Sequence, residues 1–120
     1  MFNSELMKRL SDCFGPSGRE KRIREMIMDE IKDFADEITI DPLGNLIARK
    51  KGTGKKILFS AHMDQIGLII THVDEKGLLR FANVGGLNAK ELLGLRMVFD
   101  NGLEGVICQE ELKDNEKLST

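Results

Sequence analysis

Two side chains at the end of an apolar run have the types and spacing that metal chemistry needs. His62 and Asp64 are two residues apart and follow the run Ile57–Ala61 directly. Alternate residues of a strand face the same side, so the imidazole and the carboxylate can lie side by side. A neutral imidazole is a good zinc ligand, and a neighbouring carboxylate can orient it or bind the metal directly. Spacing alone leaves open a purely structural His–Asp hydrogen bond.

The rest of the sequence offers few other reactive groups. His72 is the only other histidine, and we expect it to face solvent on the next strand. There is no HExxH, GxSxG, P-loop or GxGxxG motif. Cys13 and Cys108 form no CxxC pair, which favours two reduced thiols in a cytoplasmic protein.

Composition excludes some classes of partner. The chain has 120 residues, with 18 Lys and Arg against 20 Asp and Glu, a net charge of −2. This balance gives no electrostatic reason to expect nucleic acid or an anionic membrane as partner. The N-terminus lacks the apolar core of a signal peptide, and no apolar stretch is long enough to span a membrane. We therefore expect a soluble, cytoplasmic chain.

Periodicity predicts two helices at the start of the chain. Ser4 can cap a helix that runs to about Cys13, and the Gly-Pro-Ser-Gly stretch at 15–18 ends it. Ser17 and Glu20 have the Ser-x-x-Glu spacing of a capping box. Apolar residues at three- and four-residue steps then predict an amphipathic helix of about five turns; they are Ile23, Met26, Ile27, Ile31, Phe34 and Ala35.

Strands are predicted from residue 37 onward. The unbroken run Ile57–Ala61 is typical of a strand covered on both faces. Asn101-Gly102 favours a hairpin with a type I′ turn. The tail after Gln109 is polar and is expected to fray. The other predicted elements are strands at 37–41, 46–49, 66–73, 78–82, 95–99 and 103–108, turns at 41–44 and 74–77, and one helical turn at 89–93 capped by Asn88.

Four ordered motifs carry a resemblance to a known family. The stretch Ala61–Leu68 resembles a signature of the glutamyl aminopeptidase and tetrahedral aminopeptidase family, which are co-catalytic metallopeptidases sometimes labelled endoglucanases. Gly15–Glu20, Asp41–Leu46 and Asp74–Gly86 are similar to further family motifs, in the same order. The resemblance covers residues from about 10 to 108. At Gln65 the family usually has Glu, so this chain lacks one charge near the site.

The resemblance implies a fold and a site. Residues 1–65 would be the N-terminal segment of an α/β zinc-peptidase-like sandwich, the catalytic domain. Residues 66–120 would be an incomplete, inserted β-rich domain used for dimer assembly. The family uses two divalent metals, zinc or cobalt, and cleaves N-terminal residues from peptides. His62 would bind one metal ion. Asp64 would have the catalytic role of holding His62 and tuning its basicity.

The ligand count limits what this chain is expected to do alone. The family's other ligands and its catalytic Glu come after the inserted domain, and this chain stops inside that domain. We therefore expect at most one metal ion, held weakly through His62, and no aminopeptidase turnover by the isolated chain. The alternative is a non-catalytic, self-associating module from a truncated or split gene. Either way we expect a homo-oligomer, because an open sheet edge tends to pair with another copy.

Overall fold

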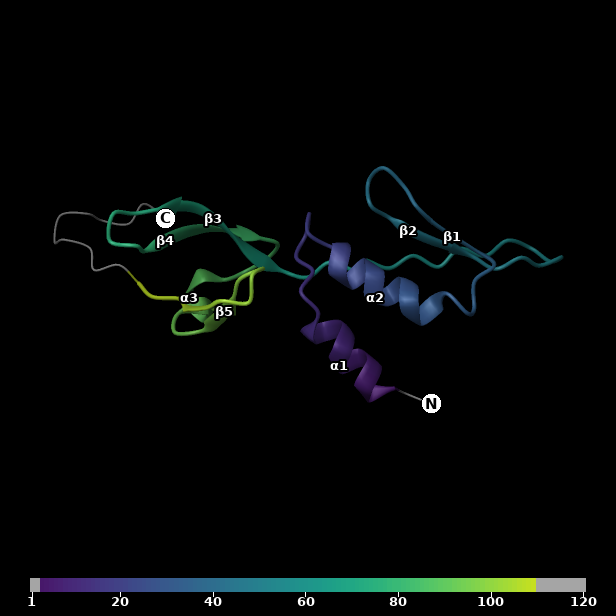
Figure 1. The fold of residues 1–120 in the computed structure, drawn as a ribbon, viewed down its shortest axis with the longest axis horizontal. Coiled ribbons are helices and arrows are strands. Elements are labelled where there is room, and N and C mark those ends of the chain that lie inside the picture. The colour runs from purple at the N-terminus through teal and green to yellow at the C-terminus, as the bar shows by residue number, and fades with distance from the viewer. Residues whose placement is uncertain (1–2, 110–120) are drawn as a thin grey trace. The chain divides into compact units, whose positions relative to one another are not determined.

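The computed structural model describes residues 3–109 (Figure 1). They form two compact units, one up to Gly85 and one from Gly86 on. The polar tail that was expected to fray begins at residue 110 and lies outside the described residues. Within the described part of the chain, no helix is long and apolar enough to cross a membrane. The predicted domain boundary near residue 65 concerns the two-domain plan of the family and stays a prediction.

Helix α1 spans Ser4–Asp12 and is capped by Asn3 rather than by Ser4. The Asn3 side chain accepts a hydrogen bond from the Leu6 backbone N–H at 3.0 Å. Asn3 has an extended backbone, as an N-cap residue needs, whereas Ser4 is already helical. The predicted cap is therefore wrong by one residue.

Helix α2 spans Lys21–Ile31, about three turns instead of the predicted five. Just after α2 the backbone turns more tightly, because the Phe34 N–H bonds at 2.9 Å to the Ile31 carbonyl, only three residues earlier. Phe34 is 74% exposed, so the apolar pattern continues beyond Ile31 without a surface to pack on. Helix stability depends mostly on such packing, which explains the early end.

The capping box predicted for α2 does not form. The residue at the N-cap position is Glu20, and it makes no side-chain cap bond. Its carboxylate instead accepts a hydrogen bond from the Gly18 backbone N–H. The Ser17 hydroxyl donates to Asp64, far away in the sequence. The Ser17 hydroxyl, which the local pattern predicts as a cap of α2, therefore bonds to a residue far away in the sequence instead.

Helices α1 and α2 contact each other, and Ile23 of α2 is 4% exposed and is the buried apolar residue of the first unit among those described. Arg9 of α1 and Glu30 of α2 form an ion pair at 2.8 Å. Gly15, in the loop between the helices, comes so close to Ile23 that a Cβ there would lie 2.6 Å from the Ile23 Cγ2. Helix α2 also holds the first hairpin, since Arg24 Nη1 donates to the Gly44 carbonyl at 3.0 Å.

The described strands form three separate antiparallel hairpins. The first pairs β1 (Glu37–Ile40) with β2 (Leu46–Arg49), and the second pairs β3 (Gly67–Val73) with β4 (Leu79–Val84). The third pairs β5 (Arg96–Val98) with β6 (Glu104–Val106). These pairings confirm the predicted alternation of strands and turns.

All three hairpins use the same turn, including the one predicted as type I′. The glycine that ends each turn has a positive φ and bonds to the carbonyl three residues earlier; these glycines are Gly44, Gly77 and Gly102. This is a three-residue loop with a left-handed glycine at its last position. A type I′ turn would also need a positive φ at Asn101, which has none, so that prediction is wrong.

The apolar run before His62 is not a strand. In Figure 1 the chain between β2 and β3 is a plain extended segment with no arrow. Ile57, Leu58 and Phe59 are 79%, 89% and 90% exposed. A strand requires a neighbour that accepts and donates its backbone hydrogen bonds, and the described residues supply none beside this run. The prediction of a strand covered on both faces is therefore wrong for this chain.

The second unit is built around Leu92, which is 6% exposed. Leu92 ends the short helix α3 (Ala89–Leu92), whose predicted cap, Asn88, accepts from the Lys90 N–H. The Gly94 N–H donates to the Ile107 carbonyl, and the Ile107 N–H donates to the Leu95 carbonyl. These bonds join the helical turn to the β5–β6 hairpin.

Candidate functional site

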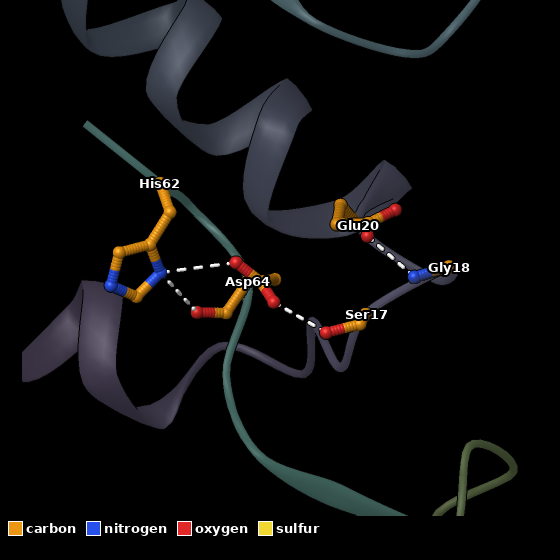
Figure 2. A network of polar contacts seen from close by, with 5 residues as sticks. All are labelled: Ser17, Gly18, Glu20, His62 and Asp64. Atoms are coloured by element: carbon orange, nitrogen blue, oxygen red, sulfur yellow. Dashed lines mark hydrogen bonds and ion pairs between the residues drawn. The ribbon is translucent and has the colours of Figure 1, made fainter. Parts of the chain in front are cut away.

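His62 and Asp64 do lie side by side, although the segment that carries them is not a strand. Figure 2 shows the imidazole turned back onto Asp64. Its Nδ1 atom is 3.0 Å from the Asp64 Oδ1 and 3.0 Å from the Asp64 backbone carbonyl oxygen. The His62 side chain is 85% exposed, and that of Asp64 is 36% exposed. The predicted pairing of imidazole and carboxylate is therefore present, at an open surface.

The contacts of His62 decide which ring nitrogen carries the proton. A carbonyl oxygen and an ionised carboxylate can only accept hydrogen bonds. Nδ1 must therefore be the donor to both. In the neutral ring this leaves the lone pair on Nε2, which points away from Asp64 in Figure 2. An imidazole oriented through Nδ1–H, with Nε2 open, is the arrangement of a metal-binding histidine held by a carboxylate.

Asp64 is held in its ionised form. The Ser17 hydroxyl donates to Asp64 Oδ2 and is the main cause that lowers the pKa of this carboxyl. Partial desolvation acts in the opposite direction, and the hydrogen bond to His62 lowers the pKa further. Each carboxylate oxygen thus has its own partner, Oδ2 with Ser17 and Oδ1 with His62.

Gln65 fastens the loop between the helices to the His62–Asp64 segment. Its Nε2 donates to the Cys13 carbonyl at 3.1 Å, and its backbone N–H donates to the Gly15 carbonyl at 3.0 Å. Pro16 and Gln65 form an isolated parallel bridge. The side-chain bond requires an N–H donor, which an ionised Glu at this position would not have. The amide of Gln65 thus provides a contact that an ionised Glu could not.

Sequence reasoning missed Ser17 and the contacts of Gln65. Ser17 is 47 residues from Asp64, and Gln65 is 52 residues from Cys13. Periodicity within a short stretch of sequence cannot predict a hydrogen bond between residues so far apart. Both residues stand in motifs that the sequence singles out, but the spacing of Ser17 to Glu20 favours a helix cap instead.

The described residues do not form a complete metal site. Within 3–109 there is no group of three or more His, Cys, Asp or Glu side chains placed to hold a metal ion. His62 fits as a single ligand, with Asp64 behind it. His72 is exposed on β3 opposite Arg80, as predicted for a solvent-facing residue. The acidic residues of the polar tail, which include Glu110, Glu111 and Asp114, lie outside the described residues.

Comparisons with known proteins agree with the motifs. A model of the M42 glutamyl aminopeptidase family matches residues 44–117, more than half of the chain. A putative aminopeptidase of Acetivibrio thermocellus is 49% identical over 113 residues, which cover 94% of this chain and 34% of that protein.

Solved structures of aminopeptidases share the fold. A TET aminopeptidase from a marine-sediment Thaumarchaeota archaeon superposes with a TM-score of 0.84 at 32% identity, over 97% of this chain and 35% of that one. The TET1 peptidase of Pyrococcus horikoshii, which can assemble into a tetrahedron or a large octahedral shell, gives 0.77 at 44% identity, over 92% and 34%.

The chain spans about a third of the length of the relatives that it matches. Over that third, the likeness confirms the predicted α/β fold class. The family match, the identity to relatives and the shared fold lead to one conclusion, which the four motifs predict: the chain belongs to the M42 glutamyl aminopeptidase family.

Proposed function

We propose that this chain carries the N-terminal part of a metal-dependent aminopeptidase, in which His62 binds one divalent metal ion, zinc or cobalt, through Nε2. The observation that carries the proposal is the bond from the His62 Nδ1–H to Asp64, which leaves Nε2 open. Asp64 holds the ring and raises its basicity, as carboxylates behind metal-binding histidines do. Family membership supplies the expected substrate, a peptide with a free N-terminus.

The proposed chemistry is metal-assisted hydrolysis. A bound divalent metal of this kind supplies an activated water and polarises the peptide carbonyl. One imidazole cannot hold two metal ions, and the described residues offer no further clustered ligands. No hydrolytic step follows from these residues alone. We therefore propose that the isolated chain holds at most one metal ion, weakly, and does not turn over substrate.

An assay with leucyl and glutamyl anilides, in zinc or cobalt, tests this proposal. We expect no metal-dependent release of the aniline above the rate in buffer alone. A metal-dependent rate that disappears in His62→Ala and persists in His72→Ala would show that the chain holds a working site, contrary to the proposal. His72 is the matched control, because it is exposed and has no place in the proposed site.

We also propose that the protein forms homo-oligomers in the cytoplasm. The assemblies of the Pyrococcus horikoshii peptidase support the first part, and the expected role of residues 66–120 in dimer assembly agrees with it. Two cysteines without a disulfide, Cys13 and Cys108, support the second part. A sedimentation mass of one 13.5 kDa chain at moderate concentration would contradict self-association.

One observation favours a second function, that of a non-catalytic, self-associating module. Three consecutive apolar side chains, Ile57 to Phe59, are at least 79% exposed, and an extended apolar segment with an unpaired backbone tends to pair with another chain. In that case His62 is a relic, and His62→Ala would leave metal binding unchanged. Loss of zinc binding in His62→Ala would instead favour the aminopeptidase reading.

A further inference from the structure

We propose that Ser17 is a positioning residue for the His62–Asp64 pair: its hydroxyl fixes the Asp64 carboxylate so that Oδ1 faces the His62 Nδ1–H. The inference builds on the proposed function, in which His62 is a metal ligand. It assigns a role in the site to a loop that lies 47 residues away in the sequence.

The two oxygens of the Asp64 carboxylate have different hydrogen-bond partners. A carboxylate turns easily about its terminal torsion, because that torsion has broad minima. Here the Ser17 hydroxyl occupies Oδ2 and the imidazole occupies Oδ1 (Figure 2). Because Ser17 holds Oδ2, the carboxylate cannot turn freely, and Oδ1 stays within hydrogen-bond distance of the imidazole. Without Ser17, Asp64 would be free to offer both oxygens to water, since the pair lies at an exposed surface.

The loop that carries Ser17 is held independently of Asp64. Gln65 bonds to the carbonyls of Cys13 and Gly15. Gly67 lies so close to Pro16 that a Cβ on Gly67 would be 2.8 Å from the Pro16 Cβ. These contacts involve residues just before Ser17 in the loop and just after Asp64 in the other segment. The hydroxyl therefore comes from a fastened loop, as a positioning group should.

Ser17 is also released from the role that its sequence context suggests. Helix α2 has no side-chain cap, and the Glu20 carboxylate bonds to the Gly18 N–H within the loop. The serine hydroxyl is thus directed to the site instead of to the helix. Removing this hydroxyl should change the position of the proton on the His62 ring more than it changes the stability of helix α2.

The position of the proton on the neutral His62 ring, on Nδ1 or on Nε2, tests the proposed role directly. If Asp64 is held, the neutral ring prefers the form with a proton on Nδ1. If the Asp64 carboxylate turns away, the Asp64 backbone carbonyl is the one remaining acceptor that the structure shows for Nδ1–H, and the ring proton shifts in part toward Nε2. ¹⁵N chemical shifts of the ring in the ¹⁵N-labelled 120-residue chain measure this ratio at a fixed pH of about 8.5, where histidine side chains are largely neutral. The measurement needs no metal and no peptide.

Ser17→Ala should lower the ratio of the Nδ1–H to the Nε2–H form of His62 by about two- to tenfold, the effect expected for the loss of one exposed hydrogen bond. Ser17→Thr keeps a hydroxyl and should restore the ratio. Ser11→Ala is the matched control: Ser11 is exposed on α1, and its removal should change nothing. Unchanged amide signals of β3 and β4 would show that the variants keep their fold.

Two outcomes would overturn the inference. If Ser17→Ala leaves the ratio unchanged while Asp64→Ala changes it, Asp64 orients the ring without Ser17. If neither variant changes the ratio, the Asp64 carboxylate does not set the position of the ring proton, which the backbone carbonyl of residue 64 then holds without it. Both results are independent of metal binding by the unaltered chain, which tests the proposed function separately.

Discussion

Replacing Gly67 with alanine tests whether the Gly15–Ser17 loop is fastened to the site segment. The added Cβ would lie 2.8 Å from the Pro16 Cβ. Carbon atoms in contact prefer about 3.5–4.0 Å, so the overlap is about 1 Å. The backbone of Gly67 does not have a positive φ, so alanine is not strained by its own conformation. The clash with Pro16 is therefore the main effect.

The magnitude follows from two opposing terms. Forcing an extra methyl group into a close contact costs about 1–3 kcal/mol. Alanine has less conformational freedom than glycine in the unfolded chain, which stabilises the folded protein by about 0.4–1 kcal/mol. We expect the contact between loop and segment to weaken by about 1–2 kcal/mol, which corresponds to a factor of about 5–30 in its opening equilibrium.

Hydrogen exchange at the Gln65 amide is the assay. This N–H donates to the Gly15 carbonyl, so it is protected only while the loop is fastened. In Gly67→Ala it should exchange about 5–30 times faster. Gly52→Ala is the matched control, because a Cβ there meets nothing within 4 Å and needs no positive φ. If the Gln65 amide exchanges equally in the two variants, the loop is not held against this segment and the reasoning fails.

Three further predictions concern the cap, the first turn and the exposed run. Asn3→Ala should reduce the helix signal of α1 in circular dichroism and cost about 0.5–2 kcal/mol, whereas Ser4→Ala should not; equal effects would contradict the assignment of the cap. Bonds from the Asn45 side chain and backbone lower the pKa of Asp41, so this carboxylate stabilises the fold above the unfolded pKa of about 3.9 and loses that effect as pH falls through its lower folded pKa. Asp41→Ala should therefore lose less stability in urea between pH of about 7 and pH of about 2.5 than the unaltered chain, and an equal loss would refute the sign. Phe59→Ser should lower the sedimentation mass if the 90% exposed Phe59 drives self-association, and an unchanged oligomer would place the interface elsewhere.

The hairpins could be predicted from the sequence because their determinants are local. Asp41 and Gly44 occupy the first and last positions of one turn, and Asp74 and Gly77 occupy those of the next. A short side chain that bonds to the backbone and a glycine with positive φ specify such turns within four residues. The prediction for the third turn is wrong in type only, since Gly102 has a positive φ and Asn101 does not.

The exposure of the run Ile57–Ala61 and the partner of Asp64 could not be predicted, for a different reason. The run Ile57–Ala61 has the composition of a strand covered on both faces, but the neighbouring chain must come from elsewhere, and the described residues do not supply it. The bond from Ser17 to Asp64 joins two motifs that can be recognised in the sequence, yet it depends on how the loop folds back. The pairing of His62 with Asp64 was predictable because it spans only two residues.

The central claim is that His62 offers Nε2 to a metal ion while Asp64 holds Nδ1. A zinc titration followed by the ¹⁵N ring signals of both histidines tests it most directly. We predict that the Nε2 signal of His62 responds to zinc, with weak affinity and no more than one equivalent, while His72 remains unaffected. A response at Nδ1 of His62, or an equal response at His72, would contradict the claim.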